Sequence, residues 1–363
     1  MRYTRERNYF CKECIKEHTF NCPTCLETVE NRHVNADRTM CTWCIEEGAG
    51  DEDENFRTNK SYRSTSKGEI INSIRPFGVE IETQYRDSDY ARRAYAKLPK
   101  GVNVGSDGSI SGNGVELRTP ILAGKKGEEL INDVCTVLVE NKFTVDKSCG
   151  MHVHIDAEDF DRHTPNEVYY YIKSIFLFYL AFEDVILSFI PKSRRHNRYC
   201  RPLRDDYNFK EISDTDSLGE IEKIWYRQRA NNNVRIQKND RKHETRYHGI
   251  NMHTLIAFRH LEVRFHSGTI NAKKINEWAN LHINIVDSMV KNIPEWSKLR
   301  EVNSVIDLNE KTRLFFQYLP SLSQNSKQYF LARQEIFNVP EKPALDEGIL
   351  EATRKSLSIE REA

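Results

Sequence analysis

The sequence lacks an excess of charge of either sign, and this bears on the partners of the protein. Its 54 basic residues equal its 54 acidic residues, so the formal net charge is zero at pH 7. Binding to nucleic acid through its phosphates requires a basic surface, and the overall charge supplies no such field. We therefore do not expect nucleic acid as a partner.

Long hydrophobic runs are also missing. The residues that follow Met1, up to Asn8, are polar or charged and no apolar stretch follows them, so we expect no secretory signal. The most apolar segment, 175–190, contains Glu183 and Asp184, which predicts a buried helix rather than a membrane span. Without export, the nine cysteines predict reduced thiols or metal ligands rather than disulfides. We expect a cytoplasmic protein without membrane contact.

Two common nucleotide-binding signatures are absent. The chain has no Gly-x4-Gly-Lys-Ser/Thr loop and no protein-kinase motifs. Internal repeats are absent as well. Any nucleotide site must therefore be built on another type of fold, for which 363 residues leave ample room.

Cysteines, in contrast, are concentrated near the N-terminus. Six of them form three Cys-x2-Cys pairs, which are Cys11/Cys14, Cys22/Cys25 and Cys41/Cys44. Fifteen residues separate the second pair from the third, a spacing typical of a structural Zn²⁺ site. A redox dithiol would be expected beside a βαβ pattern, which this region lacks. The first pair needs His18, His33 or shared cysteines to complete a site, so one zinc ion or two remain open.

These features predict a domain organisation. We expect a small zinc-binding module over 1–46 whose folding depends on its metal. An acidic and then Ser/Thr-rich segment, 47–67, predicts an exposed linker. The main domain is predicted at 68–300 and a helical extension at 301–363. The module could contact nucleic acid, dock a protein substrate or attach to the main domain. Nucleic acid is the less favoured partner, because the basic residues of the module are scattered among glutamates.

Four segments of the main domain alternate apolar and polar residues, as strands with one buried face do. They span 77–83, 114–120, 149–156 and 260–266, and helical patterns separate them. Strands with intervening helices and charge on one side only predict an α+β fold, in which helices pack on one face of the sheet.

The opposite face of this sheet has an unusual composition. A single Glu-x-Glu, such as Glu80 and Glu82, is typical of a solvated sheet face. Across the set, however, the polar positions hold carboxylates, histidines and arginines and no lysine, which predicts a cavity. The predicted lining residues are Glu80, Glu82, Glu116, Arg118, His152, His154, Glu262, Arg264 and His266.

These residue types indicate a chemistry. Carboxylates and a neutral histidine can hold Mg²⁺, and nearby arginines can neutralise phosphate oxygens, as phosphoryl transfer from a nucleotide requires. One alternative is a zinc hydrolase with His152, His154 and a carboxylate as ligands around an open position. Another is a non-catalytic binding protein in which the zinc module is the working part.

Five segments carry a resemblance to a known family. They are Gly78-Val-Glu-Ile-Glu-Thr83, Ser106-Asp-Gly-Ser109 followed by Val115-Glu-Leu-Arg-Thr-Pro120, Cys149-Gly-Met-His-Val-His-Ile155, Arg246-Tyr-His-Gly-Ile-Asn251 and Leu261-Glu-Val-Arg-Phe-His-Ser-Gly-Thr269. Through them the chain resembles, from Ile74 to Trp278, the amidoligase branch of the glutamine synthetase-like carboxylate–amine ligases. The zinc-ribbon-like N-terminus is similar to an accessory module of some relatives.

The resemblance implies a glutamine synthetase-like antiparallel sheet that binds ATP and Mg²⁺. By position in the motifs, Glu80 and Glu82 match Mg²⁺ ligands of the first strand, and Glu262 matches a further one. Glu116 matches a metal or amine-site carboxylate. His152 matches a metal or phosphate histidine, with His154 beside it.

The polar residues around these ligands also have matches. Arg246 and Arg264 match arginines that contact phosphate and substrate carboxylate, and Asn251 matches a polar position near the substrate. Arg198 resembles a further arginine of this kind. Arg118 stands where relatives commonly carry a small residue, so it could alter which carboxylate is accepted.

The implied reaction is the formation of an amide. The γ-phosphoryl group of ATP passes to a substrate carboxylate, and Mg²⁺ with Arg246 or Arg264 offsets the developing charge. An amine, deprotonated by Glu116, then displaces the phosphate from the acyl phosphate; His154 is an alternative base. The acid and the amine stay open, with a peptide or protein among the candidates. The oligomeric state is open too.

Overall fold

The computed structural model describes residues 62–106, 108–227, 238–240 and 243–338, with the short stretches 2–3, 9–10, 17–21 and 28–34 near the N-terminus. In these stretches β1 (Arg2–Tyr3) pairs with β2 (Tyr9–Phe10), and β3 (Thr19–Asn21) pairs with β4 (Thr28–Glu30), both antiparallel. The six cysteines of the predicted zinc module lie outside the described residues, so that module stays a prediction.

One sheet organises the rest of the chain, and its strand order is β11-β12-β10-β6-β8-β7. The four predicted strands are present as β6 (Phe77–Gln84), β8 (Gly114–Arg118), β10 (Gly150–Asp156) and β12 (His260–Ser267). Two short strands, β7 (Asn103–Gly105) and β11 (Ile250–Asn251), form its edges. All neighbours along this order are antiparallel.

The sheet as a whole is mixed, which corrects the expectation of a purely antiparallel one. β9 (Leu122–Ala123) pairs antiparallel with β6, but β5 (Tyr62–Arg63) pairs parallel with β9. Two backbone hydrogen bonds attach segment 62–66 to the sheet. Tyr62 N donates to Ile121 O, and Ser64 N donates to Ala123 O. Such bonds leave no mark in the hydrophobic pattern, so the polar composition of 62–66 did not predict them.

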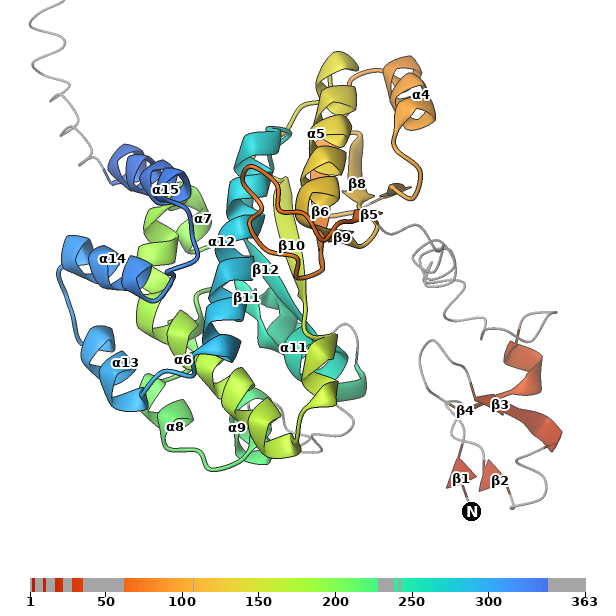
Figure 1. Ribbon diagram of the computed structural model, residues 1–363. Coiled ribbons are helices and arrows are strands. Elements are labelled where there is room, and N and C mark those ends of the chain that lie inside the picture. Colours follow the sequence, from red (N-terminus) through yellow and green to blue (C-terminus); the bar gives the residue numbers. More distant parts are fainter. Residues whose placement is uncertain are drawn as a thin grey trace, which may run out of the picture.

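Helices cover the apolar face of the sheet (Figure 1). Two of them, α5 (Gly124–Glu140) and α12 (Ala272–Lys291), contact strands of the sheet directly, and the long helix α6 (Pro165–Ser188) packs on α12. Strand residues such as Val79, Leu117 and Val153 are fully or almost fully buried on this side. The α+β class and the covered apolar face are therefore confirmed.

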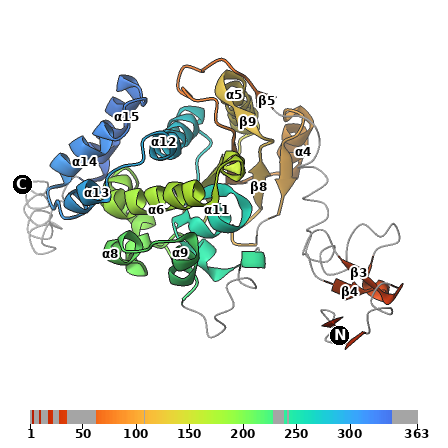
Figure 2. The ribbon, with the colours of Figure 1, turned by 60° about the horizontal axis from the view of Figure 1, so that its bottom comes forward.

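The long helix α6 is the centre of the helical layer. It begins with a capping box, in which Thr164 accepts from Glu167 N and Glu167 accepts from Thr164 N. Figure 2 shows it lying alongside the other helices. Its neighbours include α8 (Phe209–Ser213), α9 (Leu218–Trp225), α11 (Met252–Phe258), α12, α13 (Trp296–Asn303), α14 (Leu308–Gln317) and α15 (Gln324–Phe337).

The apolar sequence of α6 thus serves burial within the protein, as predicted. Across the part of the chain that the structure describes, helices of membrane-spanning length and apolarity are absent. The small helices α4 (Ser88–Lys97) and α7 (Lys192–Arg195) complete the fold.

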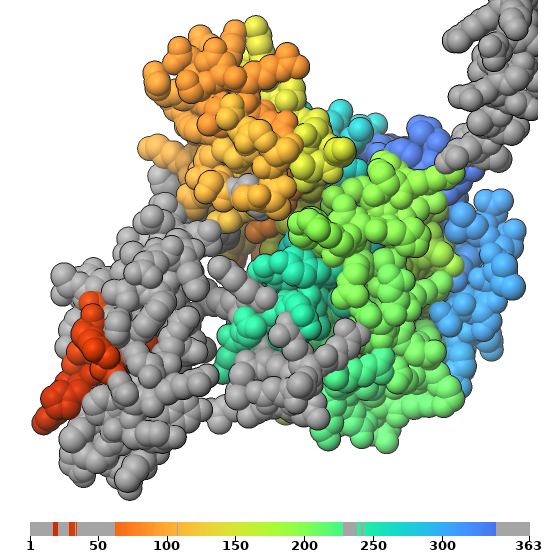
Figure 3. Space-filling model, turned by 180° about the vertical axis from the view of Figure 1, so that it is seen from behind, coloured from red at the N-terminus to blue at the C-terminus, as the bar shows by residue number. Residues whose placement is uncertain are grey.

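The helices beyond residue 300 share the core of the sheet domain. Phe315 of α14 packs against Phe178 of α6 at 5.6 Å between ring centroids, and Phe330 of α15 is fully buried. Arg333 donates from Nε to Phe189 O at 2.9 Å, at the C-terminal end of α6. Figure 3 shows this blue segment packed directly on the green one. The hydrophobic core is therefore continuous across the predicted boundary at residue 300.

A β-bulge in β12 changes which side chains face the cavity. Val153 pairs with Val263, but Met151 pairs with His266, so two residues of β12, Arg264 and Phe265, oppose His152. The extra residue reverses the alternation beyond it. His266, expected in the cavity, instead lies on the helix-covered face, 5.1 Å from Trp278 between ring centroids. That expectation was wrong because a strict period of two ignores the bulge.

Candidate active site

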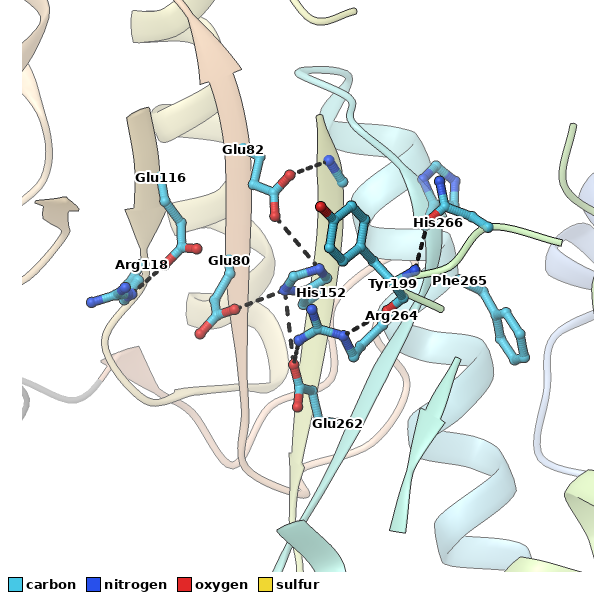
Figure 4. A network of polar contacts seen from close by, with 12 residues as sticks. Glu80, Glu82, Glu116, Arg118, His152, Tyr199, Glu262, Arg264, Phe265 and His266 are labelled. Carbon is cyan, nitrogen blue, oxygen red and sulfur yellow. Dashed lines mark hydrogen bonds and ion pairs between the residues drawn. The ribbon is translucent and has the colours of Figure 1, made fainter. Parts of the chain in front are cut away.

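The face of the sheet away from the helices gathers the other predicted residues in rows across the strands (Figure 4). Glu80 of β6 lies opposite His152 on one side and Arg118 on the other. Glu82 lies directly opposite Glu116. Antiparallel pairing places opposite side chains on one face about 5 Å apart, so four strands deliver these groups to one place.

A triad of potential metal ligands lies in the middle of this face. One ligand atom from each of Glu80, His152 and Glu262 lies within 4.8 Å of the other two. His152 Nδ1 is 2.9 Å from Glu80 Oε2 and 3.8 Å from Glu262 Oε1. Two carboxylates and one imidazole match the donor set that Mg²⁺ and Mn²⁺ accept. The triad therefore fits a divalent cation.

Glu82 and Glu116 extend the acidic region toward β8. Each is only 5% exposed. Like charges directly opposite each other in a sheet are destabilising, and burial increases the cost. Glu116 is paired with Arg118, whereas Glu82 accepts from Gly150 N and lies 3.6 Å from His152 Nε2. A second cation bound between them would lower the remaining repulsion.

Opposite charges fix the protonation of the site. Burial would raise the pKa of Glu80, but the His154 charge and bonds from His152 and His154 hold it well below its usual range. Burial would lower the pKa of His154, yet Glu80, 3.2 Å away, raises it to about 9. Glu80 and His154 therefore form a charged pair at neutral pH. His154 is placed beside the triad rather than in it.

Glu262 is held ionised in a similar way. Burial would raise its pKa, but Arg264 lowers it to about 2, with further contributions from the histidines. Asn251 Nδ2 donates to Glu262 Oε2 at 2.6 Å, and Asn251 Oδ1 caps α11 by accepting from His253 N. The cap fixes which end of the amide faces Glu262. Asn251, which the resemblance placed near the substrate, is thus a direct neighbour of a candidate metal ligand.

Two predicted arginines lie next to the acidic cluster without contacting it. Arg198 NH2 donates to the Tyr199 hydroxyl at 2.5 Å, and Arg246 NH2 donates to the Tyr247 hydroxyl at 2.8 Å. Each guanidinium also lies over its tyrosine ring, at 4.6 and 4.8 Å from the centroid. In 62–227 and 243–338, neither arginine pairs with a carboxylate.

These two arginines are joined to the site through tyrosines. The rings of Tyr199 and Tyr247 pack edge to face at 5.8 Å, and Tyr199 O accepts from Arg264 Nε at 3.4 Å. Figure 4 shows Tyr199 beside Arg264 and His152. Buried Arg246 Nε has no partner among the described residues. Within the described ranges, both guanidinium groups therefore carry positive charge that no carboxylate of the chain neutralises by an ion pair.

Sequence reasoning missed three contributors. Tyr199 and Tyr247 hold the flanking arginines, and Arg194 reaches the site from α7, within the basic stretch 194–201. The concentration of arginine in that stretch was the available signal. It did not show which guanidinium turns toward the sheet, because this depends on how α7 packs on β12.

With the geometry of the site described, comparison with known proteins identifies the family of the chain. A family model described as "Putative amidoligase enzyme" matches residues 36–286. A search of curated proteins gave no match. The matched region includes every strand of the main sheet and all the clustered residues above. The chain belongs to this amidoligase family.

Proposed function

We propose that the protein is an ATP- and Mg²⁺-dependent carboxylate–amine ligase of the glutamine synthetase-like type, which forms an amide through an acyl phosphate. The observation that carries the proposal is the Glu80–His152–Glu262 triad. It supplies hard oxygen donors next to arginines, as phosphoryl transfer requires. The family assignment supports ligase chemistry independently.

The proposed roles follow the geometry. Glu80, His152 and Glu262 would hold one Mg²⁺, and Glu82 with Glu116 would contribute to a second; bound Mg²⁺ supplies charge compensation for the phosphates. Arg264, 16% exposed and ion-paired with Glu262, would contact the transferred phosphoryl group. Glu116 is the candidate base for the amine, since Arg118 keeps it close to the cation region.

In this proposal Arg198 and Arg246 form a second subsite, which binds an anion. Their tyrosine partners leave both charges available to an added anion. Arginine suits carboxylate and phosphate because its planar fork binds two oxygens together. We propose that they bind the carboxylate substrate or the nucleotide phosphates, and that a peptide or protein can carry that carboxylate.

A zinc hydrolase is the less favoured function. It would need His152 and His154 to meet at one ion, but the triad found among the described residues contains only the first. His154 is engaged with Glu80, and its ring lies next to that of His260, tilted by 44° at 5.3 Å between ring centroids. The oxygen-rich donor set also favours Mg²⁺ over Zn²⁺.

For the N-terminal segment, the proposal rests on the spacing of its cysteines in the sequence. We propose that Cys22, Cys25, Cys41 and Cys44 bind structural Zn²⁺, and that Cys11 and Cys14 contribute to the same site or a second one. A small-molecule ligase has no need of a docking module. The module therefore favours a macromolecular substrate.

An isotope experiment tests the proposed reaction. The protein is incubated with Mg·ATP, hydroxylamine as the amine and a panel of acids labelled with ¹⁸O in the carboxylate. An acyl-phosphate route transfers one ¹⁸O to the released phosphate and yields a hydroxamate. Failure of the folded protein to bind or consume ATP with any acid would overturn the ligase proposal. Metal-dependent hydrolysis without nucleotide would favour the hydrolase.

A further inference from the structure

Arg194 lies at the rim of the site and makes an unusual set of contacts. Its side chain is buried, with the residue only 8% exposed. Nε donates to Phe265 O at 3.4 Å, and one terminal nitrogen donates to Arg264 O at 3.3 Å and to His266 O at 3.2 Å. One guanidinium thus serves three consecutive carbonyls of β12.

These carbonyls belong to the bulge. Arg264 and Phe265 are the two residues that oppose His152, so the regular ladder between β10 and β12 is interrupted there. Buried carbonyls at such an interruption need donors from elsewhere in the fold. Arg194 provides them from α7, a different element.

On its other side the bulge is held by Gly249, the residue that precedes β11. Arg264 N donates to Gly249 O at 2.7 Å. The ring of Phe265 occupies the space beside Gly249, where an added Cβ would lie 1.9 Å from a ring carbon. The backbone of Arg264 is therefore held between Gly249 and Arg194, and its side chain is directed at Glu262.

We propose that Arg194 is a positioning residue that stabilises the β12 bulge and so aims Arg264 at the carboxylate–histidine cluster. The proposal rests on the proposed function, in which Arg264 contacts the transferred phosphoryl group. Arg194 also adds charge nearby, since a Cβ built on Gly150 would lie 3.3 Å from Arg194, Glu82 and His152 atoms alike.

A conservative substitution with a neighbouring control tests this role. Arg194→Lys keeps the charge but cannot donate to three carbonyls at once, because it loses the planar fork. Arg195→Lys is the matched control. Arg195 also binds backbone carbonyls, but those of Ile190 and Phe337 rather than those of β12.

Two measurements are made on the full chain. Hydrogen exchange over 262–268 reports the bulge without any ligand, and calorimetry compares binding of Mg·ADP with Mg·AMP-PNP. We expect Arg194→Lys alone to accelerate exchange in this segment. We also expect it to reduce the preference for the γ-phosphate analogue by about tenfold or more, a usual loss for residues that orient functional groups. Arg195→Lys should leave both unchanged.

A double-mutant cycle with Arg264→Gln separates positioning from direct contact. If Arg194 acts through Arg264, the double variant loses no more γ-phosphate preference than Arg264→Gln alone. Additive losses, unchanged exchange in Arg194→Lys, or equal effects of Arg195→Lys would each overturn the proposal. A wild-type protein that binds no AMP-PNP refutes the proposed function instead, and the exchange data then decide whether Arg194 holds the bulge.

Discussion

His152 Nδ1 lies 2.9 Å from Glu80 Oε2, across the pairing of β10 with β6. The same imidazole approaches Glu82 through its other nitrogen, at 3.6 Å. A single ring therefore lies between two carboxylates of one strand, the half-buried Glu80 and the buried Glu82, and a third, Glu262, is 3.8 Å away. Several consequences of this arrangement, and of the fold that creates it, can be measured.

Removing one charge from the triad should abolish metal-dependent ATP turnover. Glu80→Gln keeps the shape but removes the charge that faces His152 and His154, and we expect at least about a hundredfold lower turnover. Glu158→Gln, at an exposed acidic residue outside the cluster, is the control and should behave as wild type. Equal turnover in Glu80→Gln and wild type would remove the triad from the mechanism.

Divalent cations should stabilise the protein through the same triad. A cation at 100 times its dissociation constant adds about 2.7 kcal/mol to the free energy of unfolding. We expect Mg²⁺ or Mn²⁺ to raise Tm in wild type and to have little effect in Glu262→Gln. Thermal denaturation with and without metal measures this, and an equal rise in both proteins would contradict it.

Acid should destabilise the fold through a buried histidine far from the triad. Burial, with help from His266, lowers the pKa of His282 from 6.5 to about 3, and Nδ1 of His282 lies 2.8 Å from the Tyr179 hydroxyl. The unfolded chain then binds more protons than the folded one between these values. Stability is therefore complete above pH 6.5 and falls as the pH drops below it.

The size of this effect can be tested by urea unfolding at pH 7 and pH 5. At pH 5, which is 1.5 units below the ordinary histidine pKa of 6.5, His282 alone should lower the free energy of unfolding by about 2 kcal/mol. His282→Gln, although less stable at pH 7, should show a smaller decline. The exposed His196→Gln should follow the wild-type profile, and an unchanged decline in His282→Gln would argue against the buried neutral form.

The helices after residue 300 should be required for the stability of the sheet domain. Phe315→Ala removes a fully buried ring that contacts α6, and we expect a loss of about 3–5 kcal/mol. Ile306→Ala, at a side chain that is 97% exposed, is the control and should change the free energy of unfolding by less than about 0.5 kcal/mol. Equal effects in urea unfolding would mean that these helices are a separate unit.

Zinc binding should require the N-terminal cysteines and none of the other cysteines. We expect one or two Zn²⁺ per chain by elemental analysis, and a loss of zinc in Cys22→Ser and Cys41→Ser. Cys135→Ala is the control, because burial raises the pKa of that thiol to about 12 and keeps it protonated. Zinc retained in both serine variants would exclude the spacing-based prediction.

The sequence by itself determined much of the fold and most of the site. Alternation along a strand is a local property, so the pattern of 77–83 already placed Glu80 and Glu82 on the face opposite Val79 and Ile81. The capping box at Thr164 and the apolar pattern after it likewise predicted α6. These features depend on residues close together in the chain.

Tertiary structure decided the rest, because it depends on pairing between distant segments. Because of the bulge opposite His152, His266 lies on the helix-covered face of the sheet while Arg264 lies on the face that carries the site. The contacts of Arg194 arise where α7 packs on β12. Backbone bonds from Tyr62 and Ser64 joined 62–66 to the sheet, and burial joined the last helices to its core. Hydrogen bonds of the main chain and register shifts carry no side-chain pattern, so only the folded structure reveals them.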